Sequence, residues 1–509
     1  MPKDPERNPK SVVSRRDVLK RVGLGAVGLT LAACGAGTSN GGASAGATAA
    51  TGGTTAANAT TGGLAAETVT SAAVAGAATA TTAAGGAATA AAPTPEPTVG
   101  VAQIGKGTQK LVFWHGLGGA DGATMVKMLQ TYAATKPDIA LRSETYDWGV
   151  FYQKLPTATA AGTPPDMVIM HSWAMKQFVD QSILQPAEDI FYSGGLVPKN
   201  DFNPALISAV TFDNKTASVP FDNHGWLNWV NTKVITDAGL DPKNLPKNGT
   251  DFIPWAQKIV VDDKGKHPNE SGFNPDKVKV WATHSSWQRY TPMSTIWQFG
   301  GGIFSDDAKK SLLDDPKSIA AMQYWQDLIT KHHVVPPAVP GVAGPGDLMK
   351  SNSIALMWDG TWNLNFFKDN PEIKVLPSFL NSYAPDGKQV VRFDSHQFVI
   401  PAGVKDPGLA AAKDLIVYLS NNGETWATSG QVPARLSVQA KPAVTSIQSV
   451  TVAANQFKAI GRPGQTHKAI NEIVTTYETA FSAILSNTTP APQAMQDASK
   501  AVQAILDRG

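Results

Sequence analysis

Hydrophobic positions in this chain alternate between strand and helix periods. Short apolar runs of strand length lie at Lys110–His115, Ile139–Tyr146 and Met167–Met170. Apolar residues at helical spacing separate the first two runs, and a second helical stretch covers Val150–Ala161. Strands that alternate with helices through short loops predict parallel βαβ units, and hence an α/β fold.

The same alternation continues toward the C-terminus. The further predicted strands are Lys215–Trp229 (two halves around Pro220–His224), Val278–Thr283, Ser353–Met357 and Ser395–Pro401, and the further helical stretches are Asp251–Val261, Ser318–His332, Pro407–Ser420 and Ile470–Leu506. Pro336–Gly346 is rich in Pro and Gly, and we interpret it as a crossover between two lobes.

The first apolar run of the chain, within Ser14–Cys34, does not belong to this alternation of strands and helices. It follows Arg15 and Arg16 and is shorter than the ~20 residues of a membrane-spanning helix, but it has the length of the apolar region of a secretory signal. The paired arginines resemble a twin-arginine export signal. The Leu-Ala-Ala-Cys that ends the run resembles a bacterial lipobox, in which the chain is cleaved before the cysteine and the thiol carries a diacylglycerol.

We therefore expect residues 1–33 to be a signal peptide and the protein to be exported. A lipid on Cys34 is expected to anchor it to the outer face of the cell membrane. Export by the general secretory route and an uncleaved N-terminal anchor helix are the alternatives.

Residues 34–107 consist almost entirely of Ala, Thr, Gly and Ser and end in a Pro-rich stretch. Without large apolar side chains, burial cannot offset the entropy of ordering such a segment. We expect a disordered tether that leads to a folded module at 108–509. About 70 flexible residues give a root-mean-square reach of roughly 45–50 Å.

Charge and cysteine content narrow the functional classes. The chain of 509 residues has a net charge of +2, and residues 1–33 carry seven Lys/Arg against three Asp/Glu, so the remainder is near −2. This balance argues against a nucleic-acid partner. No later apolar stretch approaches the ~20 residues of a second membrane span. Cys34 is the only cysteine, so the mature fold has no disulfide.

Seven short segments occur in an order that resembles the extracellular solute-binding proteins of ABC importers, in particular their sugar-binding group with the type II periplasmic-binding fold. The segments are Leu111–His115, Thr163–Val168, Leu227–Leu240, Gly300–Phe304, Ile354–Trp362, His396–Pro401 and Ser429–Arg435. They span the chain from about Thr108 to its C-terminus.

The resemblance implies two α/β lobes with a ligand cleft between them. The first lobe would hold about residues 108–221 and 337–397, and the second about 222–336 and 398–509. The resemblance further implies a monomer without a cofactor. Such a protein captures a carbohydrate by hinge closure and delivers it to the membrane subunits of an ABC permease.

A sugar presents apolar C–H faces and a rim of hydroxyl groups, so its site combines flat aromatic side chains with fixed hydrogen-bonding groups. Trp358, Asp359 and Trp362 fit this requirement best, because a carboxylate between two tryptophans can accept hydroxyl protons. The other candidates lie at predicted strand ends or in loops: Trp114, His115, Asp121, Trp148, His171, Asn223, His224, Trp287 and Arg435. Trp255 and Trp325 fall within helical apolar patterns, and we expect them in the core.

Motifs for catalysis or metal binding are weak. His115–Gly118 resembles the oxyanion loop of esterases, but the G-x-S-x-G pattern occurs at Gly37–Gly41 and Gly42–Gly46, inside the predicted tether. The chain has no H-E-x-x-H motif and no cysteine cluster, so no metal site is expected. An extracytoplasmic glycosidase or esterase, and the same binding fold for a non-sugar solute, are the alternative functions.

Overall fold

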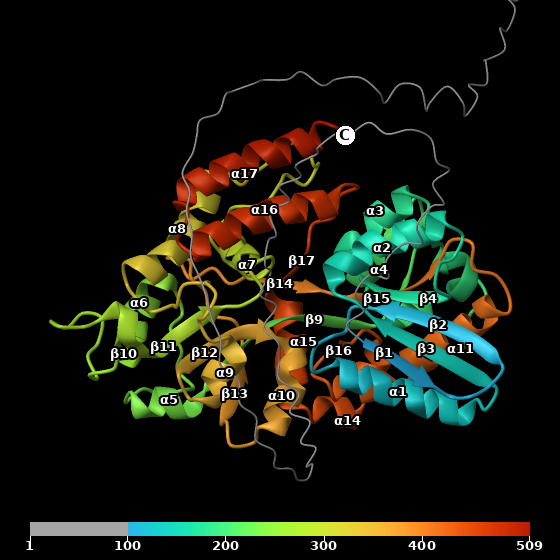
Figure 1. Ribbon diagram of the computed structural model, residues 1–509, viewed down its shortest axis with the longest axis horizontal. Coiled ribbons are helices and arrows are strands. Elements are labelled where there is room, and N and C mark those ends of the chain that lie inside the picture. Colours follow the sequence, from blue (N-terminus) through green and yellow to red (C-terminus); the bar gives the residue numbers. More distant parts are fainter. Residues whose placement is uncertain (1–99) are drawn as a thin grey trace, which may run out of the picture. The chain divides into compact units, whose positions relative to one another are not determined.

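The computed structural model describes residues 100–509 (Figure 1). The predicted signal peptide, Cys34 and most of the predicted tether lie outside the described residues. The tether prediction is wrong at its C-terminal end, because Gly100–Ile104 forms strand β1. β1 pairs antiparallel with β3 (Ile139–Thr145) and buries Ile104, so it satisfies the backbone groups along the outer edge of β3.

The first of two large sheets has the strand order β1-β3-β2-β4-β15-β5, and β8 also pairs with β15. Its other strands are β2 (Gln109–His115), β4 (Met167–His171), β5 (Leu184–Gln185), β8 (Val219–Pro220) and β15 (His396–Pro401). β2 runs parallel to both β3 and β4, which confirms the predicted βαβ units, whereas β15 runs antiparallel to β4.

The second sheet has the order β10-β11-β12-β9-β14-β17, with β13 and β16 also paired to β9. Its strands are β9 (Asp222–Asn231), β10 (Val261–Asp262), β11 (Val278–Ser285), β12 (Ile354–Gly360), β13 (Val375–Ser378), β14 (Val391–Asp394), β16 (Val432–Pro433) and β17 (Gly461–Pro463). The predicted strand Lys215–Trp229 is therefore divided, and β9 extends through most of its second half. A small separate hairpin joins β6 (Thr211–Phe212) to β7 (Lys215–Thr216).

Helices flank both sheets. Within residues 100–220 and around β15 they are α1 (Gly122–Thr135), α2 (Trp148–Ala160), α3 (Met175–Asp180), α4 (Pro204–Ala209), α11 (Gly408–Asn421) and α12 (Gly423–Ala427). The others are α5 (Thr232–Asp237), α6 (Gly249–Ile259), α7 (Thr291–Gln298), α8 (Pro316–Thr330), α9 (Pro345–Lys350), α10 (Leu364–Asp369), α13 (Leu436–Gln439), α14 (Pro442–Thr445), α15 (Gln448–Ile460), α16 (Ile470–Leu485) and α17 (Ala491–Leu506). None of the helices within 100–509 combines the length and apolar character that crossing a membrane requires.

The predicted division into lobes is wrong for residues 337–394. β12 pairs parallel to β11 and antiparallel to β9, so this part of the chain stays in the second sheet. Pro336–Gly346 is therefore no crossover between lobes, because it links α8 to α9 on the same sheet. The chain instead returns to the first sheet at β15, so the prediction that residues from 398 onward belong to the second lobe is also wrong for the rest of β15 and for α11.

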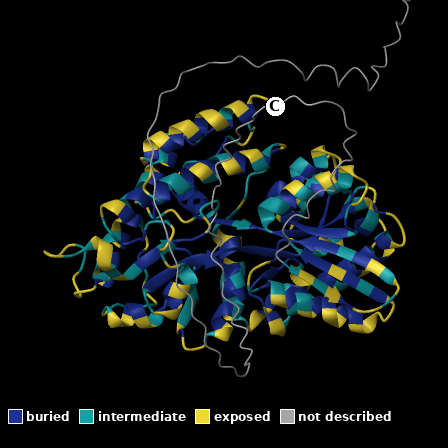
Figure 2. Cartoon of the chain, viewed as in Figure 1, coloured by how far each residue is buried: buried dark blue, intermediate teal, exposed yellow. Residues whose placement is uncertain are grey.

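Each sheet has a buried apolar cluster of its own, and a third cluster joins β4 and β15 of the first sheet to α7, α16 and α17. The central strands β4, β9, β12 and β15 are buried throughout, while the outer faces of helices such as α1 and α17 are exposed (Figure 2). In the first lobe α11 packs Leu415 and Ile416 against the same cluster as Leu111 of β2. In the second lobe Trp325 is fully buried, as predicted, and Trp255 packs half-buried against that core.

Candidate functional site

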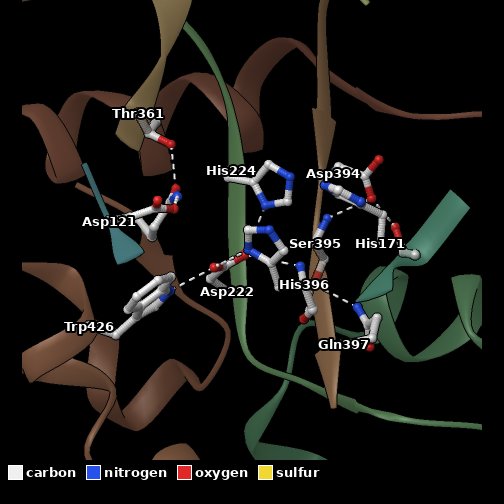
Figure 3. Close-up of polar contacts among 12 residues, drawn as sticks. Asp121, His171, Asp222, His224, Thr361, Asp394, Ser395, His396, Gln397 and Trp426 are labelled. Carbon is white, nitrogen blue, oxygen red and sulfur yellow. Dashed lines mark hydrogen bonds and ion pairs between the residues drawn. The ribbon is translucent and has the colours of Figure 1, made fainter. Parts of the chain in front are cut away.

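The chain passes between the two sheets at Phe221, which separates β8 from β9, and at Ser395, which separates β14 from β15. Three histidines meet beside these crossovers (Figure 3). His171 ends β4 and lies opposite His396 of β15, while His224 lies on β9 just after the first crossover. One nitrogen atom of each ring lies within 4.8 Å of the others. We call His171, His224 and His396 the histidine cluster.

Asp222 holds two members of this cluster. Its Oδ1 lies 3.0 Å from Nδ1 of His224, and its Oδ2 lies 2.8 Å from Nδ1 of His396. The indole N–H of Trp426 donates to the same Oδ2 at 2.7 Å. Burial alone would raise the pKa of Asp222, but the charge of His396 and the imidazole hydrogen bonds hold that pKa well below its ordinary value. The carboxylate therefore remains charged although it is fully buried.

The third histidine is fixed from the first sheet. The hydroxyl of Tyr152 lies 2.7 Å from Nδ1 of His171. Trp148 covers this region, with its ring centroid 4.2 Å from that of His171 and stacked on His396 at 5.8 Å. A Cβ atom on Gly116 would lie 2.2 Å from the Trp148 ring, so only glycine lets the indole lie this close to the backbone.

Two tryptophans that follow strands of the second sheet form an aromatic pair, of which Trp287 is exposed and Trp362 is half-buried. Trp287 follows β11 and is 40% exposed, and its ring is perpendicular to that of Trp362 with the centroids 5.6 Å apart. The Trp287 indole N–H donates to Oδ1 of Asp359 at 2.9 Å. Trp287 also has a φ of +50°, which is uncommon for a bulky residue and is a form of strain that concentrates at functional sites. A Cβ on Gly360 would lie 2.2 Å from the Trp362 ring, so this indole also lies against backbone.

Asp359 is itself buried, so it influences this aromatic pair by fixing the Trp287 ring. Its carboxylate also accepts the backbone N–H of Gly360 at 2.6 Å, and burial raises the pKa of this carboxyl group. The aromatic chain continues from Trp362 to Trp226, whose ring is perpendicular at 5.6 Å, and to His224 at 6.1 Å. The paired tryptophans and the histidine cluster are therefore neighbours.

A polar bridge crosses between the lobes on the other side of the cluster. Gln431, just before β16, donates to Oδ2 of Asp121 at 2.9 Å and accepts the hydroxyl of Thr361 at 2.6 Å. Burial raises the pKa of Asp121. Asn223 lies on β9 next to His224, and its side-chain oxygen is buried without a hydrogen-bond partner among the described residues.

Sequence reasoning missed a second buried group at the junction. Arg392 donates to Oδ2 of Asp394, and the hydroxyl of Ser172 donates to Oδ1, both at 2.5 Å. The Arg392 guanidinium lies 4.3 Å from the centroid of Tyr290, and together with Trp173 these two residues line a small cavity. Arg392 and Asp394 lie on β14 with one residue between them. This strand was not predicted, because no apolar pattern indicated it.

Two tryptophans that we predicted to contact the ligand, Trp358 and Trp114, are buried in the protein interior instead. Trp358 is fully buried, stacks on Tyr383 at 4.6 Å and donates to Oδ1 of Asn381. Trp114 is also buried and packs its edge against Tyr146. Both tryptophans belong to lobe cores, because their strands are covered on both faces.

Two other predicted residues are held by structural partners. Nδ1 of His115 accepts the backbone N–H of Leu117, so Nε2 donates to the hydroxyl of Ser143 at 2.8 Å. Burial, followed by the nearby charge of His396, lowers the pKa of His115 to about 3. The guanidinium of Arg435 forms an ion pair with Asp201 at 2.7 Å, so the charge of Arg435 is already neutralised by this partner.

A family model decides the classification. The model described as bacterial extracellular solute-binding protein matches residues 117–426, more than half of the chain. The chain belongs to this family. The resemblance drawn from the seven sequence segments is thereby confirmed.

Relatives of this solute-binding protein are named as binding proteins. It is 28% identical over 154 residues to the sn-glycerol-3-phosphate-binding periplasmic protein UgpB of Escherichia coli, covering 29% of this chain and 34% of that protein. It is 23% identical to the arabinooligosaccharide-binding protein of Halalkalibacterium halodurans, covering 66% and 74% of the two chains. The chain spans only 34% to 58% of the length of UgpB and of a Brucella abortus binding protein that it also matches.

A solved structure establishes the architecture. The ABC transporter solute-binding protein of Thermotoga lettingae, bound with α-D-tagatose, superposes with a TM-score of 0.67 at 22% identity. The match covers 78% of this chain and all of that one. The predicted two-lobe α/β fold of periplasmic solute-binding proteins is therefore confirmed.

Proposed function

We propose that this protein is the carbohydrate-binding component of an ABC importer, anchored by lipid at Cys34, which binds a sugar or oligosaccharide at the junction of its two sheets. The observation that carries the proposal is the perpendicular pair formed by the exposed Trp287 and the half-buried Trp362. The apolar face of a pyranose ring packs favourably on such indoles, while nearby polar atoms bind its hydroxyls.

Fixed polar groups complete the site. Asp359 orients Trp287, Trp148 faces the junction from the first sheet, and the free side-chain oxygen of Asn223 can accept a sugar hydroxyl. The names of two similar proteins, which mention arabinooligosaccharides and tagatose, support the same chemical class.

The position of the site between the two sheets predicts that ligand binding closes the two lobes around it. Bound ligand that touches both sheets favours the closed state, because only that state makes all contacts at once. The closed receptor would then dock on the permease and release its solute there.

The proposal is tested by screening the purified protein against mono- and oligosaccharides, with amino acids, polyamines and glycerol phosphate as non-sugar controls. Tryptophan fluorescence and thermal unfolding report binding. We expect at least one carbohydrate to change both signals. If only a non-sugar solute does so, the carbohydrate assignment is wrong and the binding fold serves another ligand.

Catalysis and anchoring are tested separately. We expect no turnover of chromogenic glycosides or esters, and hydrolysis that depends on a junction carboxylate would contradict a purely binding role. Changing Cys34 to Ser should release the protein from the membrane fraction, and a product that stays bound would exclude the lipid anchor.

A further inference from the structure

We propose that His171, His224 and His396 bind a divalent transition-metal ion of the Zn²⁺ type across the two sheets. One nitrogen of each imidazole lies within 4.8 Å of the others, and all three side chains are buried. Neutral imidazole is a preferred ligand of Zn²⁺, Cu²⁺ and Ni²⁺, whereas Mg²⁺ and Ca²⁺ prefer oxygen, so the charged form of His396 releases its Nε2 proton to solvent when the ion binds. The cluster therefore selects for the first group.

Hydrogen bonds to Nδ1 orient all three rings. Nδ1 of His224 and of His396 bond the two oxygens of Asp222, which leaves Nε2 of each as the ligand atom. A histidine that donates through one nitrogen to a carboxylate and binds metal through the other is the common arrangement in zinc sites. The single buried charge of Asp222 also offsets part of the charge of the cation.

The third ring has the corresponding partner. The oxygen of Tyr152 lies 2.7 Å from Nδ1 of His171 and also accepts the backbone N–H of that residue. It can accept an Nδ1–H in the tautomer whose Nε2 binds metal. The rings of His224 and His396 stack with centroids 4.0 Å apart. Zn–N bonds of about 2.0–2.1 Å would draw the nitrogens together, so metal binding rotates these rings slightly inward.

The site lies where the two sheets meet. His171 and His396 belong to the first sheet and His224 to the second, on either side of the crossover at Phe221. A bound ion would tie the sheets together at this point. Three protein ligands leave a fourth position for water or for an oxygen atom of a bound solute. Sequence spacing could not reveal the site, because its members come from three strands distant in the chain.

The test uses the mature chain stripped with a chelator and then dialysed. Calorimetric titration with Zn²⁺ should show one ion per chain, and Co²⁺ should give the visible absorption of a tetrahedral nitrogen-ligated ion. We expect His224→Gln to abolish stoichiometric binding. Asp222→Asn should weaken it roughly 10- to 100-fold, because the rings lose their orienting carboxylate. His332→Gln, which changes the partly exposed neighbour of His333, is the matched control and should bind normally.

If the wild-type chain fails to bind Zn²⁺ stoichiometrically, the proposal is wrong, whether or not the variants fold. Stoichiometric binding that His224→Gln retains would place the ion elsewhere and would also overturn it. Circular dichroism of each stripped variant separates loss of the site from loss of the fold. Neither result depends on which solute the protein carries.

Discussion

At the scale of single residues, the aromatic pair depends on groups that are not aromatic. Asp359 accepts the indole N–H of Trp287, and the absence of a Cβ on Gly360 leaves space for Trp362. Trp287 keeps an unfavourable backbone conformation and 40% of its surface exposed. A ring held in this way loses little further freedom when a ligand packs on it.

Replacing the carboxylate of Asp359 should therefore affect solute binding indirectly. Asp359→Ala frees the Trp287 ring, and we expect the affinity for the carbohydrate to fall about tenfold, ~1.4 kcal/mol. Asp359→Asn keeps an oxygen acceptor and should stay within about twofold of wild type. Fluorescence titration of both variants checks this. Equal losses would mean that the charge of Asp359, and not its acceptor atom, matters.

His115 predicts a specific dependence of stability on pH. Its pKa falls from 6.5 in the unfolded chain to about 3 in the folded one, chiefly through burial. The unfolded state therefore binds more protons, and this stability contribution is present above pH 6.5 and is lost as pH falls toward 3. Between pH 7 and pH 5 the loss amounts to about 2 kcal/mol.

His115→Gln removes that titration. Urea unfolding at several pH values should show a shallower decline in the free energy of unfolding for this variant than for wild type. Parallel declines in the two proteins would show that His115 does not stay neutral in the fold.

At the scale of elements, periodicity located most strands and helices but not their partners. Met125, Met128, Leu129 and Tyr132 are all buried on α1, as their helical spacing predicted. β1 was missed because Gly100–Ile104 has only one deeply buried side chain, so its pairing rather than its composition makes it a strand. The lobe assignment failed for a similar reason, since nothing in the residues of β12 indicates that its neighbours are β11 and β9.

The same limit applies to the site. Trp287 and Trp362 were predicted because loops after strands carry functional residues. Trp358 has the same chemistry one residue before Asp359, and only burial distinguishes it. His396 and Asp222 were not predicted, because their role depends on two crossovers that bring distant segments together.

The face of β1 can be tested directly. Ile104 is 7% exposed and Val101 is 46% exposed on the same strand. We expect Ile104→Ala to lower the free energy of unfolding by about 2 kcal/mol, and Val101→Ala to change it by less than about 0.5 kcal/mol. Urea unfolding measures both. Equal effects would show that β1 does not dock on β3 in this register.

At the scale of the whole molecule, side-chain hydrogen bonds join the two lobes. Asn365 on α10 donates to the carbonyl of Ala120 at 2.9 Å and to the hydroxyl of Thr124 at 3.1 Å, both in the first lobe. In the proposed hinge closure such contacts favour the closed state before ligand binds, and so we expect them to raise the apparent affinity for the solute.

Asn365→Ala should therefore weaken solute binding roughly fivefold, about 1 kcal/mol, without touching the ligand. Asn370→Ala is the matched control, because Asn370 bonds the carbonyl of Phe366 within the same helix. Titration calorimetry and small-angle scattering of both variants check the prediction. An unchanged affinity in Asn365→Ala would show that this contact does not influence closure.

The most direct test of a carbohydrate site at the junction is a calorimetric titration of the best-binding sugar against three variants. Trp287→Ala and Trp362→Ala should each lower the affinity at least about tenfold. Trp255→Ala removes a half-buried tryptophan from α6 and should leave the affinity unchanged. If Trp287→Ala and Trp362→Ala fold normally and bind the sugar as tightly as Trp255→Ala, the carbohydrate does not bind at this junction.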